Sequence, residues 1–193
     1  MIYLVRHGQT QFNAQGRLQG RLDSSLTDLG RRQAVAVGSS LRTILASPAD
    51  TRLESSPLGR ARDTAEIIRA TLGGGVVGCD ERLREISLGS WDGLTPAEIE
   101  IRWPGLWRST VRESWAETCP DGEPYDDAVA RLAAWLSSAI DGEPRIVVSH
   151  GGAISILRGL HLGLSRAETL SLAVPHGVIF ALSPGEITAI PCG

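Results

Sequence analysis

The chain contains no lysine, so all 19 of its basic residues are arginines. Arginine binds phosphate and carboxylate groups bidentately, but a GC-rich source genome would produce the same bias, and we favour that interpretation. The formal net charge of -3 over 193 residues gives no indication of a nucleic-acid surface or a polybasic membrane patch. Any affinity for anions must therefore come from a few arginines placed locally.

Cysteine is also scarce, and metal-binding patterns are missing. Cys79, Cys119 and Cys192 are widely spaced and form no CxxC pair, which excludes a disulfide framework and a zinc knuckle. No HxH or HExxH motif occurs, and no carboxylate lies at ligand spacing from His150 or His161. We therefore expect chemistry that needs no metal and no cofactor.

Long hydrophobic runs are missing as well. The longest apolar runs are far shorter than a membrane span, and the sequence opens directly on a predicted core strand without a leader pattern. The length and the 42% hydrophobic content suit one domain, residues 1–193, with a substantial core. A cytoplasmic enzyme without nucleic-acid or membrane partners is the expectation, and a homodimer stays possible.

Short apolar runs alternate with amphipathic stretches along the chain. The apolar runs predict strands at 2–5, 52–55, 76–77, 145–149, 178–182 and 187–190. Helical spacing predicts helices over about 27–46, 60–72, 126–140 and 153–162. Residues 9–26 read as a loop, 82–86 as an extended segment, and 163–177 as a connector. This alternation predicts a three-layer α/β/α fold with a mostly parallel mixed sheet, to which the closing hairpin adds an antiparallel edge.

Residues 87–125 differ in kind from the rest. They hold four of the five tryptophans (Trp91, Trp103, Trp107 and Trp115) and several prolines, with only weak periodicity. This composition predicts a cap insertion that covers something, not a core layer. We interpret the tryptophans as packing for the cap, with stacking against a ligand as the alternative.

Two predicted strands end in a histidine followed by glycine, at His7 and at His150, and a third leads into a loop that carries Arg60. Ligands of open α/β sheets bind at the carboxyl ends of the strands. If these ends converge, two imidazoles and the guanidiniums of Arg6 and Arg60 face one point. The arginines should then lower the pKa of both histidines and keep them neutral near pH 7. A neutral imidazole flanked by arginines is a nucleophile toward phosphorus.

Four motifs follow one another between residues 3 and 156. They are Arg6-His7-Gly8 with Gln9-Thr10, Ser56-Pro57-Leu58-x-Arg60-Ala61 with Thr64-Ala65, Leu83-x-Glu85-x-x-x-Gly89-x-Trp91-x-Gly93, and Ser149-His150-Gly151-Gly152. Together they resemble the histidine phosphatase superfamily, which includes the cofactor-dependent phosphoglycerate mutases. A single tripeptide such as RHG arises by chance in roughly 2% of chains this long, but four ordered motifs are specific. The resemblance implies a phosphoglycerate mutase-like fold.

The resemblance also implies catalytic roles. His7 would attack phosphorus in line and become a phosphohistidine, while Arg6, Arg60 and His150 would hold the transferred oxygens. Glu85 would protonate the leaving oxygen and then deprotonate the hydrolytic water. The alternative for Glu85 is a carboxylate in a surface salt bridge.

Substrate contacts are expected from six further residues: Asn13, Gln19, Arg17, Arg21, Gly151 and His176. For Arg17 and Arg21, a solvated loop face is as good an interpretation as a second anion site. His176 stands where family members usually carry asparagine, and it could enter the pocket. Asp92 replaces a usual glutamate and could alter the seating of the cap, Gln9 replaces a common acidic residue, and Glu123 should anchor a loop.

The expected activity is hydrolysis of a small phosphorylated metabolite. A mutase must keep its phosphohistidine away from water. The phosphoglycerate mutases of the family are longer, with further inserted segments and a C-terminal tail over the pocket, whereas this chain has only the stretch 87–125. A mutase remains the alternative within the family. A non-catalytic phospho-ligand binding protein is the alternative of another class, and the full set of His7, Arg60, Glu85 and His150 argues against it.

Overall fold

Six strands form one mixed sheet in the computed structural model, which describes residues 1–109, 118–139 and 142–193. The strands are β1 (Ile2–Arg6), β2 (Arg52–Ser55), β3 (Val77–Cys79), β4 (Arg145–Ser149), β5 (Val178–Ser183) and β6 (Glu186–Pro191). Their order is β3-β2-β4-β1-β5-β6. The first four strands in this order run parallel, and β5 is antiparallel to both β1 and β6. The predicted parallel sheet with an antiparallel edge is confirmed.

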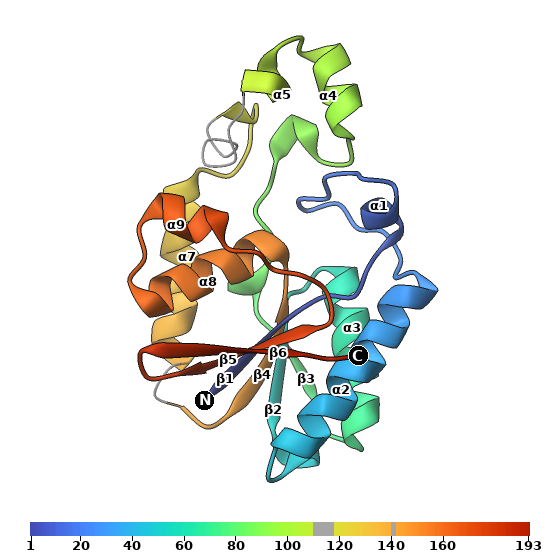
Figure 1. Ribbon diagram of the computed structural model, residues 1–193, viewed down its shortest axis with the longest axis vertical. Coiled ribbons are helices and arrows are strands. Elements are labelled where there is room, and N and C mark those ends of the chain that lie inside the picture. Colours follow the sequence, from blue (N-terminus) through green and yellow to red (C-terminus); the bar gives the residue numbers. More distant parts are fainter. Residues whose placement is uncertain (110–117, 140–141) are drawn as a thin grey trace.

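Both faces of the sheet are covered by helices, so the central strands are apolar on both sides (Figure 1). Ile2 and Leu4 of β1 pack with α7 (Tyr125–Ala139), α8 (Gly151–Leu162) and α9 (Arg166–Ser171). Tyr3 and Val5 pack on the other face with α2 (Asp28–Ile44) and α3 (Gly59–Leu72). Because neighbouring strand residues point to opposite faces, β1 reads as an unbroken apolar run. The three-layer prediction is confirmed.

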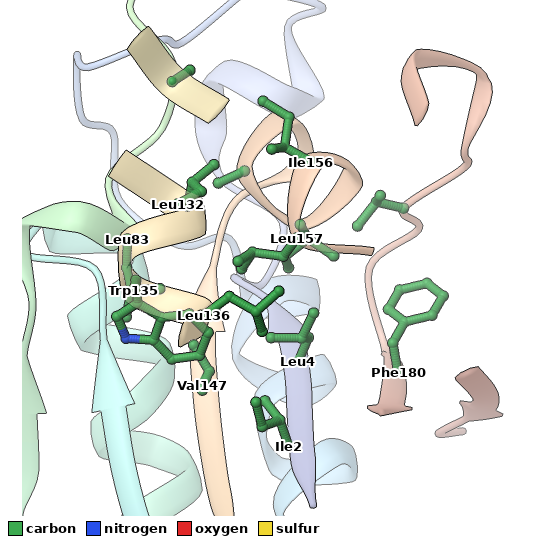
Figure 2. Close-up of a cluster of buried hydrophobic side chains, with 14 of the residues drawn as sticks. Ile2, Leu4, Leu83, Leu132, Trp135, Leu136, Val147, Ile156, Leu157 and Phe180 are labelled. Carbon is green, nitrogen blue, oxygen red and sulfur yellow. The ribbon is translucent and has the colours of Figure 1, made fainter. Parts of the chain in front are cut away.

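The first of these two cores is the one drawn in Figure 2. Leu4 and Val147, from the neighbouring strands β1 and β4, lie against Trp135, Leu136 and Leu157 of the covering helices (Figure 2). All five side chains are at most 7% exposed. This packing fixes the central strands, and with them the chain ends that leave the sheet.

Three predicted irregular segments contain short helices instead. The loop 9–26 holds α1 (Gln11–Ala14), the extended segment 82–86 overlaps the 3-10 helix η2 (Glu81–Leu83), and the connector 163–177 holds α9. A further 3-10 helix, η1 (Pro48–Asp50), precedes β2. Helices this short have too few residues to show a periodicity. Their caps stabilise them: Ser165 and Glu168 form a capping box at α9, a pattern that the sequence does display.

The described part of residues 87–125, called the cap below, lies beyond the carboxyl end of β1 (Figure 1). It contains η3 (Gly89–Trp91), α4 (Pro96–Arg102) and α5 (Leu106–Ser109). Trp91, Trp103 and Trp107 pack in one small apolar cluster of its own, which supports the packing interpretation. Trp115 falls outside the described residues.

The cap is closed at its base by backbone hydrogen bonds. The Glu123 amide donates to the Ser87 carbonyl at 2.9 Å, and the Ser90 amide donates to the Pro120 carbonyl at 3.0 Å. Glu123 also binds Arg131 of α7 through its carboxylate, at 2.8 Å, which agrees with the predicted anchoring role. Within the described ranges, no helix has the length and apolar character needed to cross a membrane.

Candidate active site

Three strand ends converge where the sequence predicted a shared site. The His7 amide donates to the Ser149 carbonyl at the end of β4, and the Ser56 amide donates to the Val148 carbonyl, both at 2.9 Å. The rings of His7 and His150 consequently lie with their centroids 5.2 Å apart. Both histidines are at most 2% exposed, as is Arg60. The sheet therefore brings two imidazoles and a guanidinium to one buried point.

The His7 ring is held so that one nitrogen is free to act as a base or nucleophile. Its Nδ1 lies 2.8 Å from the Gly8 carbonyl, which can only accept, so Nδ1 carries the proton. Nε2 therefore keeps its lone pair, and it accepts from Nε of Arg60 at 3.3 Å. Burial lowers the pKa of His7 well below its usual value, and the charges of Arg60 and Arg6 lower it further. The predicted lowering is confirmed, with burial as its largest cause.

Gly8 lets the chain turn away from β1 against the start of α2. A Cβ at Gly8 would overlap the Gly30 carbonyl group, so no other residue fits without a backbone shift. The Gly8 amide donates to Oγ1 of Thr64 on α3, at 3.0 Å. These contacts to both covering helices set the position of the carbonyl that orients His7.

Arg60 stands in the first turn of α3, and its guanidinium is bound to the loop that precedes α2. It donates to the carbonyls of Gly20 and Leu22, both at 2.7 Å, and to the Asp23 carboxylate at 2.8 Å. Asp23 in turn accepts from the Gly59 amide at 2.6 Å, at the N-terminus of α3. Asp23 therefore positions Arg60, and sequence patterns could not identify it because its partners are 36 and 37 residues away.

Two buried nitrogen atoms beside His7 have no hydrogen-bond partner in the described part of the chain. They are Nε of Arg6 and Nδ1 of His150. Arg6 uses one of its other nitrogens to bind the Val174 carbonyl at 2.7 Å, and Nε2 of His150 lies 2.7 Å from the Ser56 hydroxyl. Buried polar atoms are almost always hydrogen-bonded in proteins, so both nitrogens could donate to an anion placed beside His7.

The pKa values of His150 and Arg6 are both lowered. For His150 the largest cause is burial, followed by the charge of Arg60. For Arg6 the largest cause is again burial, which the negative charge of Glu85 partly offsets. An anion at this point would relieve both groups of unfavourable electrostatics.

Glu85 lies at the N-terminus of α8, where helix amide groups are unpaired. Its carboxylate accepts from the Gly152 and Ala153 amides, both at 3.1 Å, and from the Ile86 amide at 3.0 Å. The positive end of the helix dipole also favours a carboxylate here. Glu85 therefore makes contacts to the chain near His150, in place of the surface salt bridge that the sequence left open.

A cavity of about 510 Å³ opens onto this point. Its polar lining includes Arg6, His7, Arg60, Glu85 and Gly151. Among the predicted substrate contacts, Asn13, Arg17 and Gln19 also line it. In the described ranges, no cluster of three or more histidine, cysteine or carboxylate side chains is arranged to bind a metal ion.

Two further predicted contact residues lie outside this lining. Arg21 points to a separate surface hollow, where it pairs with Glu123 at 3.3 Å. His176 is half-buried beneath His7: its Nδ1 donates to the His7 carbonyl at 2.7 Å, and the two ring centroids are 5.6 Å apart. Burial, and secondarily Arg6, lower the pKa of His176 to about 4. His176 thus contacts the backbone of the candidate nucleophile.

His161, expected to be structural, binds the Ser183 carbonyl through Nε2 at 2.6 Å, far from the cavity lining.

Comparison with known proteins gives one consistent result. The family described as "Histidine phosphatase superfamily (branch 1)" matches residues 2–186. A glucosyl-3-phosphoglycerate phosphatase of Mycolicibacterium vanbaalenii is 38% identical over 173 residues, which cover 84% of this chain and 74% of that protein. A probable phosphoglycerate mutase, GpmB, of Klebsiella pneumoniae is 39% identical over 166 residues, which cover 84% of this chain and 75% of that protein.

Solved structures agree with these matches. The mycobacterial glucosyl-3-phosphoglycerate phosphatase in complex with VO3 superposes with a TM-score of 0.78 at 36% identity, over 93% of this chain and 92% of that one. YhfR of Bacillus stearothermophilus gives a TM-score of 0.80 at 31% identity, over 97% and 93% of the two chains.

Proposed function

Because the chain belongs to branch 1 of the histidine phosphatase superfamily, we propose that it is a metal-independent phosphatase. It hydrolyses a small phosphomonoester in two steps, through a phosphohistidine on His7. The observation that carries this proposal is the state of His7: a neutral imidazole with Nε2 unprotonated, beside two buried nitrogens that lack an acceptor. That arrangement suits a dianionic phosphoryl group held next to a nucleophile.

In the first step, the Nε2 lone pair of His7 forms a bond to phosphorus while the bond to the ester oxygen breaks. Arg6 and Arg60 neutralise the charge on the phosphoryl oxygens. If the Ser56 hydroxyl donates to Nε2 of His150, then Nδ1 of His150 carries a proton and donates it in a hydrogen bond to a third position on the group. Ser56 would thereby select the tautomer of His150 that binds an anion.

Glu85 supplies the proton that the departing oxygen needs. The acid form of Glu85 gives its proton to that oxygen, so the product leaves as a neutral alcohol. The three amides around its carboxylate stabilise the charge that appears as the proton leaves. In the second step the carboxylate takes a proton from water, the hydroxide attacks phosphorus, and the bond between phosphorus and His7 breaks.

Phosphate release from p-nitrophenyl phosphate in the presence of EDTA tests the proposal. We expect turnover to persist under chelation, and His7→Ala to lower kcat by at least about 1000-fold, as loss of a covalent nucleophile does in other enzymes. Glu85→Gln should lower turnover of alkyl phosphates more than that of p-nitrophenyl phosphate, whose leaving group needs no proton. Loss of all activity in EDTA, or equal losses for both ester types, would contradict the mechanism.

A phosphoglycerate mutase is the second candidate, because relatives at about 39% identity carry that name. A mutase would interconvert 3-phosphoglycerate and 2-phosphoglycerate when primed with 2,3-bisphosphoglycerate, without net release of phosphate. A non-catalytic binding protein would bind vanadate but turn over neither type of substrate. The same purified protein therefore separates the three functions.

A further inference from the structure

The cavity has two chemically different ends. Arg6, His7, Arg60 and Glu85 gather at the strand ends, whereas the remaining wall is built mainly from apolar side chains. The apolar lining residues are Leu18, Ile86, Leu88, Trp91, Trp107, Leu170, Leu172 and Val174. They come from the loop after α1, from the cap and the residue before it, from α9 and from the segment after α9. The part of a substrate beyond the phosphate therefore meets hydrocarbon and indole.

A second anionic group on the substrate finds little support at the apolar end. Besides Arg6 and Arg60, the described lining contains one cationic side chain, Arg17. Its guanidinium binds Glu98 bidentately, at 2.7 and 3.1 Å, and donates to the Gly93 carbonyl at 2.7 Å. Glu98 neutralises the charge of Arg17, and the pair fixes the cap to the loop after α1. A carboxylate that packs against these described residues would lose its hydration without gaining a counter-charge from them.

Two tryptophans give the apolar wall a fixed aromatic part. Trp91 is completely buried, and it packs edge to face with Trp107, with ring centroids 5.7 Å apart. Both residues line the cavity. Because aromatic pairs of this kind hold each other in place, the wall has a defined shape.

We infer that the alcohol released by the enzyme is uncharged, with an apolar or aromatic face. The inference rests on the phosphatase activity proposed above and names its substrate class. Monoesters that carry a carboxylate or a second phosphate are poor substrates. The preference therefore differs from the compound that names the mycobacterial relatives, since a phosphoglycerate bears a carboxylate.

Three monoesters that all release a primary alkoxide test this inference: 2-phenylethyl phosphate, glycerol 1-phosphate and 3-phosphoglycerate. Matching the leaving groups removes differences in bond cleavage from the comparison. We expect kcat/KM to be more than about tenfold higher for 2-phenylethyl phosphate than for 3-phosphoglycerate, because even one methylene in an apolar pocket gives discrimination of about that size. Equal or better hydrolysis of 3-phosphoglycerate overturns the inference and leaves the phosphatase intact. No turnover of these esters or of p-nitrophenyl phosphate overturns the proposed function itself.

Two variants locate the preference in the apolar wall. Leu172→Arg adds a cation there and should raise kcat/KM for 3-phosphoglycerate relative to 2-phenylethyl phosphate by about tenfold. The matched control is Val35→Arg, on the exposed face of α2 and outside the cavity, which should leave the ratio unchanged. If Leu172→Arg does not fold, Trp107→Ala should lower the ratio of phenylethyl to glycerol ester by several-fold. A ratio equal to that of Val35→Arg in each folded variant overturns the assignment to this wall.

Discussion

The position of the Glu85 carboxylate requires a glycine at position 152. A Cβ built on Gly152 would lie 2.8 Å from Oε1 of Glu85 and 2.8 Å from the side chain of Ile86. At Gly151 the nearest atoms to a Cβ belong to Arg6, at 3.6 Å, which is ordinary van der Waals contact. There is therefore space for a methyl group at Gly151 but not at Gly152, although both glycines lie in the first turn of α8.

Gly152→Ala should therefore lower kcat for an alkyl phosphate by at least about tenfold, because Glu85 must move from its amide partners and geometry of this kind is costly to disturb. Gly151→Ala should retain more activity. Because the Cβ of Gly152→Ala also meets Ile86, thermal unfolding of both variants is measured alongside, and the comparison is made at a temperature where both are folded. Steady-state kinetics on both variants checks this, and equal losses in the two would refute the role of the Gly152 gap.

The residues at the strand ends could be predicted from the sequence, whereas the long-range contacts that support them could not. Arg6, His7, Arg60 and His150 come together as predicted, because each stands at a strand end or the first helix turn beside one. Asp23 could not be found in this way. Its role depends on a side-chain contact made only when the loop folds back on α3. His176 was predicted as a substrate contact, but its hydrogen bond to the His7 carbonyl, across 169 residues of sequence, was not.

Among the elements, the loop between α1 and α2 connects the cap to Arg60. Asp92 of the cap accepts from the Leu88 amide at 2.9 Å and from the Arg21 amide at 3.2 Å. Gly20, at φ +48°, lies so close that a Cβ there would overlap the Asp92 carboxylate. The carbonyl of Gly20 then receives Arg60. The position of the cap and the position of the Arg60 guanidinium are consequently linked.

Asp92→Ala removes both acceptors and should lower kcat/KM by about tenfold, since each lost hydrogen bond of this type weakens the loop by about 1 kcal/mol. It should also weaken the binding of vanadate, which reports on the Arg60 end of the site. Asp92→Asn keeps one oxygen and should have a smaller effect. Asp50→Ala, on the exposed helix η1, is the control. If the Kd for vanadate is the same for Asp92→Ala as for the control, the position of the cap does not influence Arg60.

Elements were predictable where they were long. The apolar period of α2 and its N-cap Thr27 are plain in the sequence, and Thr27 does accept from the Gly30 amide. The η2 turn and α1 escaped prediction because their stability comes from local side-chain caps by Asp80 and Thr10, not from a repeating apolar face.

For the whole molecule, three histidines with lowered pKa values make stability depend on pH. His7, His150 and His176 stay neutral in the folded protein because burial opposes their charging. In the unfolded chain a histidine takes up a proton near pH 6.5. As pH falls below about 6.5, the unfolded state therefore binds protons that the folded state does not, and the free energy of unfolding decreases.

His176→Asn should reduce this loss. With a folded pKa of about 4, His176 contributes a loss of about 1–2 kcal/mol between pH 7 and pH 5, after allowance for its partial exposure. Urea unfolding of the native protein and of the variant at both pH values measures it, with ionic strength held constant. The variant should be less stable than the native protein by a smaller margin at pH 5 than at pH 7. Parallel pH dependence in the two proteins would show that His176 titrates alike in the folded and unfolded states.

Two backbone hydrogen bonds, from Glu123 to Ser87 and from Ser90 to Pro120, hold the two ends of the cap together. We call this paired base the stem of the cap. With the stem fixed, doubling the length of chain above it adds only about 0.6 kcal/mol of closure entropy. In the described residues, the cap is joined to the strand ends by this stem and by the contacts that Asp92 and Glu98 make with the loop after α1. Exchange of residues 99–119 can therefore give new specificities, while Asp92 and Glu98 keep the cap in contact with the loop after α1.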